Sequence, residues 1–367
     1  MIFGDNPIVD TTTVENAGAN TGAMVGSNSG TIIVNAGLGF NDTKALCQDI
    51  IRDELSKYAQ EAYTEAENRS EELFERVVAE LDERKMTDTQ ALSVFSDPAM
   101  QFDYFEAQKA YMKVGTPELA DILSHIIADR AGESKRTLLQ ITLGEAIKVA
   151  PKLVGTQMST LALVFMIKHV CITNIYSYED LINHIRTRIL PIYQKGISQK
   201  DSEFQHLNFT GCSQNAYATT LLSPFYYFQL AYPGLFMKGI ARDDLPKDSN
   251  GVNLADRYPD LFVKCLNDDK LLQLACVPKE DLQTMMAKLN IEKEHQEIIH
   301  NLFKSNKMHV QAVHDIIVKL VPEMQEISVY WDSHQIYAMD LSSVGIVLGA
   351  QYAQMITGEK YDLTIWI

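Results

Sequence analysis

The chain has 367 residues, of which 46% are hydrophobic and 22% are charged, and its formal net charge is −16. This length accommodates two or three packed domains, and the apolar content excludes a chain that is disordered throughout. The sequence pI is near 5.0 and no Lys- or Arg-rich run occurs, which argues against a nucleic-acid partner because phosphate binding requires a basic surface.

The first 44 residues and the cysteines indicate the cellular compartment. No basic residue precedes Lys44 and no continuous apolar stretch occurs there, so neither a secretory signal nor a transit peptide is expected. We therefore expect a cytoplasmic protein. The five cysteines contain no CxxC pair, so we expect them to be reduced and mostly buried, with no metal and no cofactor. They are Cys47, Cys171, Cys212, Cys265 and Cys276.

Residues 1–40 contain two copies of an eight-residue pattern, Gly-x-Asn-x-Gly-x-apolar-apolar. The copies are Gly18, Asn20, Gly22, Met24, Val25 and Gly26, Asn28, Gly30, Ile32, Ile33. Gly and Asn tolerate the left-handed conformations that corners between short strands require, so the pattern predicts a short β-arc or β-helix-like segment. Two rungs cannot bury a core alone, so this segment is expected to mediate oligomerisation. The alternative is a disordered Gly/Asn/Thr-rich tail.

Residues 41–86 predict one long helix, capped by Asn41 or Asp42 and free of Pro and Gly up to about Lys85. Apolar residues keep helical spacing while charged residues fill the other faces. These apolar residues are Leu46, Ile50, Leu55, Tyr58, Ala62, Ala66, Phe74, Val77 and Leu81. Such a helix packs along its own domain or against a neighbouring copy. The first arrangement is favoured because the stripe is rich in Ala and Tyr.

Residues 87–200 predict a helical bundle. Helix starts are marked by the pairs Thr87/Gln90, Asp97-Pro98, Thr116-Pro117 and Ser177/Asp180. Residues 138–154 and 157–176 are the most apolar helices and are expected to form the core. The expected centre of this core is Leu139, Ile141, Leu143, Leu161, Leu163, Phe165 and Ile167.

Residues 201–258 predict a loop-rich segment, in which loops at 196–218 and 241–258 flank the aromatic residues 221–240. Pro224, Pro233 and Gly234 divide this aromatic stretch into pieces too short to span a membrane. A buried hairpin or a subunit contact is favoured, with membrane insertion as the alternative. The candidate partner contacts are Phe225, Tyr226, Tyr227, Tyr232 and Phe236.

Residues 259–367 predict a small C-terminal α(+β) unit, giving a mainly α fold. A strand is expected at residues 327–331. The closing run 361–367 is rich in apolar residues and should dock as a strand or into a groove, held by a helix at 341–356.

No motif in the chain predicts a catalytic site. His295 and His300 are five positions apart, which places them about 140° apart on a helix and does not fit HExxH, so solvated helix faces are expected. Cys212 and Ser213 lack the context of a nucleophile. A further polar group is interpreted as structural ion pairs. It comprises Asp129, Arg130, Glu133 and Arg136.

Residues 95–130, 138–153 and 357–367 resemble a bacterial family of uncharacterised proteins known by locus-tag names. The resemblance implies a cytoplasmic bacterial protein that takes part in anti-phage defence, and it supplies no active site. We therefore expect a self-assembling, non-enzymatic sensor or scaffold, a homo-oligomer whose partner is a phage component or a co-encoded effector. The alternatives are an effector enzyme, such as a nuclease or nucleotide hydrolase with a site formed on oligomerisation, and a membrane-active effector.

Overall fold

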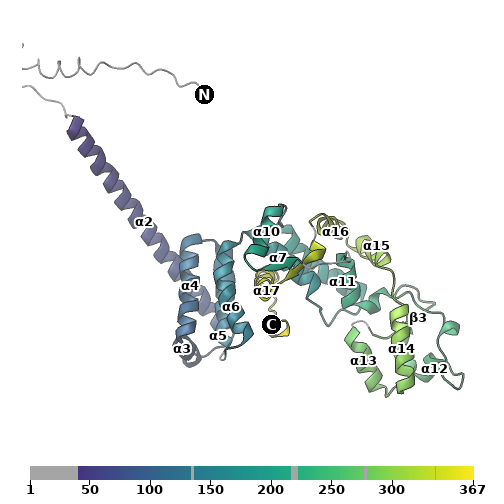
Figure 1. The fold of residues 1–367 in the computed structure, drawn as a ribbon. Coiled ribbons are helices and arrows are strands. Elements are labelled where there is room, and N and C mark those ends of the chain that lie inside the picture. The colour runs from purple at the N-terminus through teal and green to yellow at the C-terminus, as the bar shows by residue number, and fades with distance from the viewer. Residues whose placement is uncertain (1–39, 134–135, 216–221, 277–278, 335) are drawn as a thin grey trace, which may run out of the picture. The chain divides into compact units, whose positions relative to one another are not determined.

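The computed structural model describes residues 40–133, 136–215, 222–276, 279–334 and 336–367, and these are mainly helical (Figure 1). The chain divides into two compact units, Met1–Thr64 and Glu65–Ile367. The β-arc expected within residues 1–40 lies outside the described residues, apart from Phe40, which begins a helix.

The long helix is confirmed as α2 (Phe40–Glu83). Its charged faces carry ion pairs between neighbouring turns, with Arg69 Nε 2.9 Å from Glu65 and Arg76 Nη2 2.8 Å from Glu72. Such pairs stabilise an exposed helix by a few tenths of a kcal/mol each, about 0.2–0.5 kcal/mol. The helix ends shortly before Lys85, whose φ of 57° turns the chain away.

The bundle predicted after α2 is confirmed. Its first helices are α3 (Asp88–Phe95), α4 (Pro98–Val114), α5 (Pro117–Gly132), α6 (Leu138–Val149), the short 3-10 turn η1 (Ala150–Lys152) and α7 (Gly155–Lys168). Of these, α4, α5 and α6 lie side by side (Figure 1). Helix α4 begins as its sequence predicts, because the Asp97 carboxylate accepts a hydrogen bond from the Ala99 N–H and Pro98 occupies the first turn.

The middle of the chain contains more helix than its composition predicts. Its elements are α8 (Tyr178–His184), the π-helical turn η2 (Ile185–Ile189), α9 (Leu190–Gln194), α10 (Asp201–Phe209), α11 (Pro224–Ala231) and the 3-10 turn η3 (Pro233–Phe236). The prediction of a loop at residues 196–218 is wrong for residues 201–209, which form helix α10. Glu203 caps this helix by accepting hydrogen bonds from the N–H groups of Gln199 and Lys200, and Leu207 is buried beneath it.

The C-terminal part is also helical. It contains η4 (Arg242–Asp244), α12 (Leu254–Arg257), η5 (Pro259–Leu261), α13 (Lys279–Lys288), α14 (Lys293–Ser305), α15 (Val310–Leu320), α16 (Met324–Ser333), η6 (Ile336–Ala338), α17 (Ser343–Thr357) and η7 (Leu363–Ile365). Two short antiparallel pairs accompany these helices. They join β1 (Ser213–Asn215) to β4 (Met339–Leu341), and β2 (Phe262–Lys264) to β3 (Leu272–Leu274).

The strand expected at residues 327–331 is wrong, because these residues lie within helix α16. Ile327, Tyr330 and Trp331 are buried at i, i+3 and i+4, which is the spacing of one helix face. The closing run docks on the chain's own body as the 3-10 turn η7 and not as a strand. Trp366 Nε1 donates to the His169 carbonyl oxygen at 3.1 Å.

The main hydrophobic core is centred on α7 and α17, which pack closely against each other. A Cβ added at Gly349 would lie 2.8 Å from the Leu161 carbonyl oxygen, so only glycine permits this approach. Six of the seven predicted core residues are buried, but Ile141 is 45% exposed on the outer face of α6. A second, smaller core lies within residues 237–303, around Leu254, Leu261 and Ile299.

Candidate functional site

Helix α2 carries an apolar stripe that is longer than the part of it that is buried. In the sequence, the stripe runs along one side of the helix through Ile51, Leu55, Tyr58, Ala62, Ala66, Leu73, Val77 and Leu81. Its last three residues are buried in the main core. All side chains of residues 56–65 are exposed, and Tyr58 and Tyr63 are 60% and 66% exposed. Tyr58 and Ala62 of the stripe are therefore accessible to a partner.

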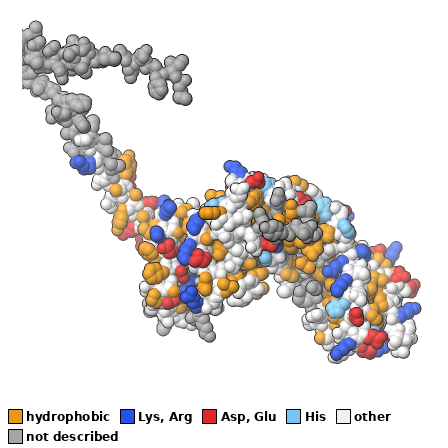
Figure 2. Space-filling view, viewed as in Figure 1, with side chains coloured by type: hydrophobic (Ala, Val, Ile, Leu, Met, Phe, Trp, Pro, Cys, Tyr) orange, Lys and Arg blue, Asp and Glu red, His pale blue; other side chains and the backbone are white. Residues whose placement is uncertain are grey.

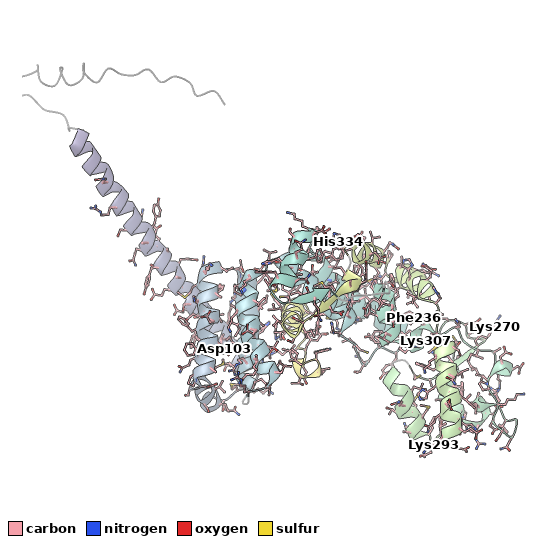
Figure 3. All side chains as sticks on the ribbon, viewed as in Figure 1. Asp103, Phe236, Lys270, Lys293, Lys307 and His334 are labelled. Carbon is pink, nitrogen blue, oxygen red and sulfur yellow. The ribbon has the colours of Figure 1, made fainter. Side chains whose placement is uncertain are left out.

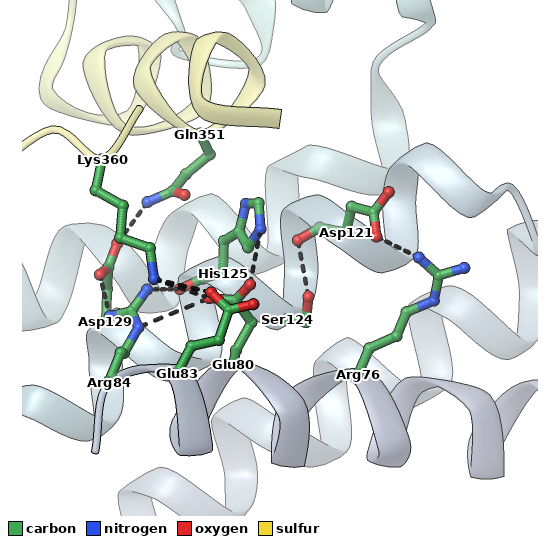
Figure 4. A network of polar contacts seen from close by, with 10 residues as sticks. All are labelled: Arg76, Glu80, Glu83, Arg84, Asp121, Ser124, His125, Asp129, Gln351 and Lys360. Carbon is green, nitrogen blue, oxygen red and sulfur yellow. Dashed lines mark hydrogen bonds and ion pairs between the residues drawn. The ribbon is translucent and has the colours of Figure 1, made fainter. Parts of the chain in front are cut away.

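A polar network holds the C-terminal half of α2 against the bundle (Figure 4). Arg76 and Arg84 of α2 pair with Asp121 and Asp129 of α5, respectively. Gln351 of α17 donates a hydrogen bond to the same Asp129. These contacts link residues far apart in the sequence, so they fix this half of α2 in place.

Glu80 lies at the centre of the same network. Its Oε1 is 3.1 Å from His125 Nε2 on α5, and Lys360 Nζ is 3.8 Å from its other carboxylate oxygen. The hydrogen bond from His125 lowers the pKa of Glu80, so the carboxylate stays ionised near neutral pH. We interpret the network as a structural anchor, because its donors and acceptors face one another across helices.

The group Asp129, Arg130, Glu133 and Arg136 does not form one site. Asp129 belongs to the α2 anchor, whereas Arg130 is buried and its Nε is 2.9 Å from Asp103 Oδ2 of α4. Glu133 accepts a hydrogen bond from the Thr137 hydroxyl, and Arg136 is exposed. The interpretation as structural ion pairs is therefore confirmed for Asp129 and Arg130.

A second accessible apolar surface lies on helices α4 and α6. Phe102 and Phe105 of α4 are 71% and 56% exposed, and Leu138 and Ile141 of α6 are 61% and 45% exposed. The two helices are neighbours, because a Cβ added at Gly144 of α6 would lie 3.1 Å from the carboxylate of Asp103, labelled in Figure 3. Figure 2 shows hydrophobic side chains on the part of this surface that lies over α4.

The aromatic segment, of which the structure describes residues 222–240, is largely buried in the interior of the chain. Phe225, Tyr232 and Phe236 are at most 1% exposed, and the Tyr232 hydroxyl accepts a hydrogen bond from the Ile172 N–H at 2.8 Å. Their burial within this chain corrects the expectation that they contact a partner. Tyr226 and Tyr227 are half-buried and remain accessible. No described helix is both long and apolar enough to cross a membrane.

Tyr227 and Lys168 line a cavity of about 450 Å³, and Lys168 is a residue that the sequence did not single out. Lys168 Nζ donates to the carbonyl oxygens of Tyr337 and Met339, at 3.1 and 2.7 Å, and lies 5.5 Å from the ring centroids of Tyr227 and Trp331. Burial lowers its pKa to about 8. Because two carbonyl groups already bind the amine, we interpret Lys168 as a structural cation that ties β4 to α7. The sequence signal for this site is a lysine at the end of an otherwise apolar run, residues 161–167.

The candidate nucleophiles lie near a second, polar cavity of about 270 Å³. Ser213 lines it, but its hydroxyl donates to Asn208 Oδ1 at 2.7 Å and so has no basic partner. His334, labelled in Figure 3, lines the same cavity and bonds Ser333 through Nδ1 at 2.9 Å. Cys212 is buried, and burial raises the pKa of its thiol, which opposes thiolate formation.

The histidine pair on α14 is divided by burial. His295 is 3% exposed and its Nδ1 lies 2.8 Å from the Tyr258 hydroxyl, so the expected solvated position is wrong for this residue. His300 is half-buried at the edge of another cavity. The described part of the chain contains no group of three or more His, Cys, Asp or Glu side chains that could hold a metal ion. Cys212, Cys265 and Cys276 are buried and Cys171 is exposed.

Comparison with protein families identifies the family of this chain. A family model covers residues 37–367. The chain belongs to this family. The family is known by a locus-tag name with the suffix "-like", and its description assigns no activity. No curated protein and no solved structure matches the chain.

Proposed function

We propose that this chain is a self-assembling, non-enzymatic scaffold or sensor and that helix α2 is the main contact between its copies. The observation that carries the proposal is the apolar stripe of α2, which continues from the buried residues Leu73 and Val77 to the exposed Tyr58. A stripe that served only the chain's own core would end where the buried residues end.

The low stability of an unpacked helix supports a contact between copies. At 1.5 Å per residue, its 44 residues extend over about 66 Å. Isolated helices are marginally stable in water, and most helices gain their stability from packing an apolar face. A second copy of α2 laid along the stripe would cover Tyr58 and Ala62 and supply that packing. The 11-residue rhythm of the stripe, with spacings of four, three and four from Ile51 to Ala62, suits helices that run alongside each other.

Light scattering of the full chain in solution tests the proposal. The wild-type protein should have the mass of an oligomer at micromolar concentration. A Tyr58→Lys/Tyr63→Lys variant should have a lower mass, because two charges then lie on or beside the stripe. Tyr176→Lys is the matched control, since Tyr176 is a comparably exposed tyrosine, at 57%, on another part of the chain. A monomeric wild-type protein would refute the proposal.

Two further surfaces are compared in the same experiment. The Gly/Asn repeat of residues 1–40 is the other proposed assembly element, so a chain lacking residues 1–39 should also form smaller oligomers. Phe102→Lys/Phe105→Lys changes the exposed surface of α4. If this variant dissociates and the α2 variant does not, the bundle and not α2 carries the contact.

The proposed partners are a phage component or a co-encoded effector protein, in keeping with the anti-phage role that the sequence resemblance implies. Expression of the chain should then reduce phage plating, and the α2 variant should lose this protection. Divalent-metal-dependent hydrolysis of a nucleic acid or nucleotide would instead support the effector enzyme. Flotation with liposomes would support the membrane-active effector.

A further inference from the structure

A cavity of about 690 Å³ opens at one end of the helical bundle. Its walls come from the end of α4, the start of α5, the connection between α6 and α7, Lys195 at the end of α9, and Tyr352 of α17. These segments belong to one compact unit, Glu65–Ile367. The volume lies within the range of about 300–1,000 Å³ that is usual for small-molecule sites.

The floor of this cavity is apolar and rigidly held. Leu119, Ile122 and Met158 line it and are each at most 5% exposed, because they also belong to the main core. Leu153 and Val154, from the connection before α7, extend the apolar wall towards the surface. Such a lining suits the hydrocarbon body of a ligand and disfavours a purely polar one.

The polar groups around this floor are mostly donors. Lys152 and Lys195 line the cavity and are exposed, and neither forms an ion pair with any side chain that the structure describes. Glu118 is the acidic residue of the lining, so the charges in the lining sum to +1. This positive cavity contrasts with the chain's net charge of −16.

Tyr352 adds a buried donor. Its side chain lines the cavity and is 5% exposed. Its hydroxyl oxygen accepts a hydrogen bond from the Ser159 hydroxyl at 3.2 Å. Within the described part of the chain, no acceptor receives the tyrosine's own proton, so this proton is available to a ligand.

We propose that this cavity binds a small amphipathic carboxylate, with its aliphatic body on the Leu119/Ile122/Met158 floor and its carboxylate directed to Lys152 or Lys195. Carboxylates form their strongest hydrogen bonds with charged donors, and the two lysines supply these at the rim. Binding at this cavity uses no residue of the α2 stripe, so the proposal is independent of self-assembly.

Titration calorimetry of the full chain with sodium decanoate tests the proposal. Decanoate should bind with one site per chain, acetate should not bind because it lacks the aliphatic body, and decan-1-ol should bind more weakly because it lacks the charge. A Lys152→Glu/Lys195→Glu variant should bind decanoate at least about tenfold more weakly, since each reversal replaces an attraction by a repulsion near the surface. Both positions are exposed, so the variant should fold normally.

The matched control is Lys264→Glu/Lys319→Glu, which makes the same change of charge at exposed positions outside this cavity. This control should bind decanoate as the wild-type chain does. Tyr352→Phe removes one hydroxyl group and keeps the aromatic packing, so it should weaken decanoate binding less than the Lys152→Glu/Lys195→Glu variant does. Absence of decanoate binding to the wild-type chain at millimolar concentration overturns the proposal. Equal binding to the two double variants also overturns it.

Discussion

His184 shows how a single residue makes this protein sensitive to acid. It ends helix α8, is 1% exposed and lies with its ring edge against Tyr232, at a centroid distance of 6.5 Å. Burial lowers its pKa to about 3, whereas an unfolded histidine titrates near 6.5. Below pH 6.5 the unfolded chain therefore binds a proton that the folded chain does not. The free energy of unfolding decreases as the pH is lowered from 6.5.

We predict that His184→Phe reduces this loss of stability. Between pH 7 and pH 5, the free energy of unfolding of the wild-type chain should fall by up to about 2 kcal/mol through His184. This is the free energy of protonating a group of pKa 6.5 at pH 5, which is about 1.4 kcal/mol for each of 1.5 pH units. Urea denaturation at both pH values measures the difference between the variant and the wild-type chain. Equal pH dependence in the two proteins would show that His184 takes up its proton in the folded state.

Phe165 gives the corresponding prediction for packing. It is fully buried in α7 and contacts two aromatic rings of the C-terminal run, Tyr361 at 5.4 Å and Trp366 at 5.0 Å between centroids. Phe165→Ala should lower the free energy of unfolding by about 3–5 kcal/mol. Ile141 is the exposed residue that the sequence placed in the core. Ile141→Ala should lower the free energy of unfolding by no more than about 0.5 kcal/mol. A cost for Ile141→Ala comparable to that of Phe165→Ala would contradict the observed burial.

At the scale of elements, the closing run depends on helices that precede it by almost two hundred residues. Leu363 is buried, and Trp366 donates its hydrogen bond to His169, which follows α7. Arg188 of η2 pairs with Glu359 just before this run, with Nε 2.6 Å from Oε2. The turn η7 is thus held by tertiary contacts and not by strand pairing.

Removal of residues 361–367 should therefore lower the melting temperature. The deletion exposes part of the Phe165 side chain and leaves the His169 carbonyl without its Trp366 donor, and both effects destabilise the folded state. Thermal denaturation followed by circular dichroism measures the change. Trp366→Phe is the milder control, since it retains a ring at this position and loses only the hydrogen bond. An unchanged melting temperature in the deletion would mean that the run contributes nothing to the fold.

At the scale of the whole molecule, the unit Glu65–Ile367 contains two hydrophobic cores. The smaller core within residues 237–303 packs around Leu254 and Ile299, both fully buried. Separate cores can unfold with separate free energies, because each is stabilised mainly by its own contacts. The connection between them includes hydrogen bonds such as that from Gln273 Nε2 to the Gly234 carbonyl oxygen, at 2.8 Å.

We predict two unfolding transitions in scanning calorimetry. Ile299→Ala should shift the transition of the smaller core, and Phe165→Ala should shift that of the main core, with little effect of either on the other. Since the two residues are in different cores, their costs should also be additive. A single transition that both variants shift equally would show that the two cores unfold as one cooperative unit.

The sequence by itself determined the elements whose signals are local. Helix α2 follows from an uninterrupted polar and apolar periodicity, and the starts of α4 and α8 follow from caps such as Asp97 and Ser177, which bond the backbone within three residues. It also located α7 in the core, because residues 161–167 of that helix form an uninterrupted apolar run.

Tertiary structure decided what depends on neighbours that are distant in the chain. Ile141 is apolar but exposed on an outer face, whereas residues 327–331, whose composition suits a strand, belong to helix α16 and bury Ile327, Tyr330 and Trp331. The burial of Phe225 and the cavity at Tyr352 likewise arise from segments more than fifty residues apart. Caps and periodicity act within one or two helical turns, but solvent exposure and cavities are set by whichever elements pack alongside, and only the folded chain brings these together.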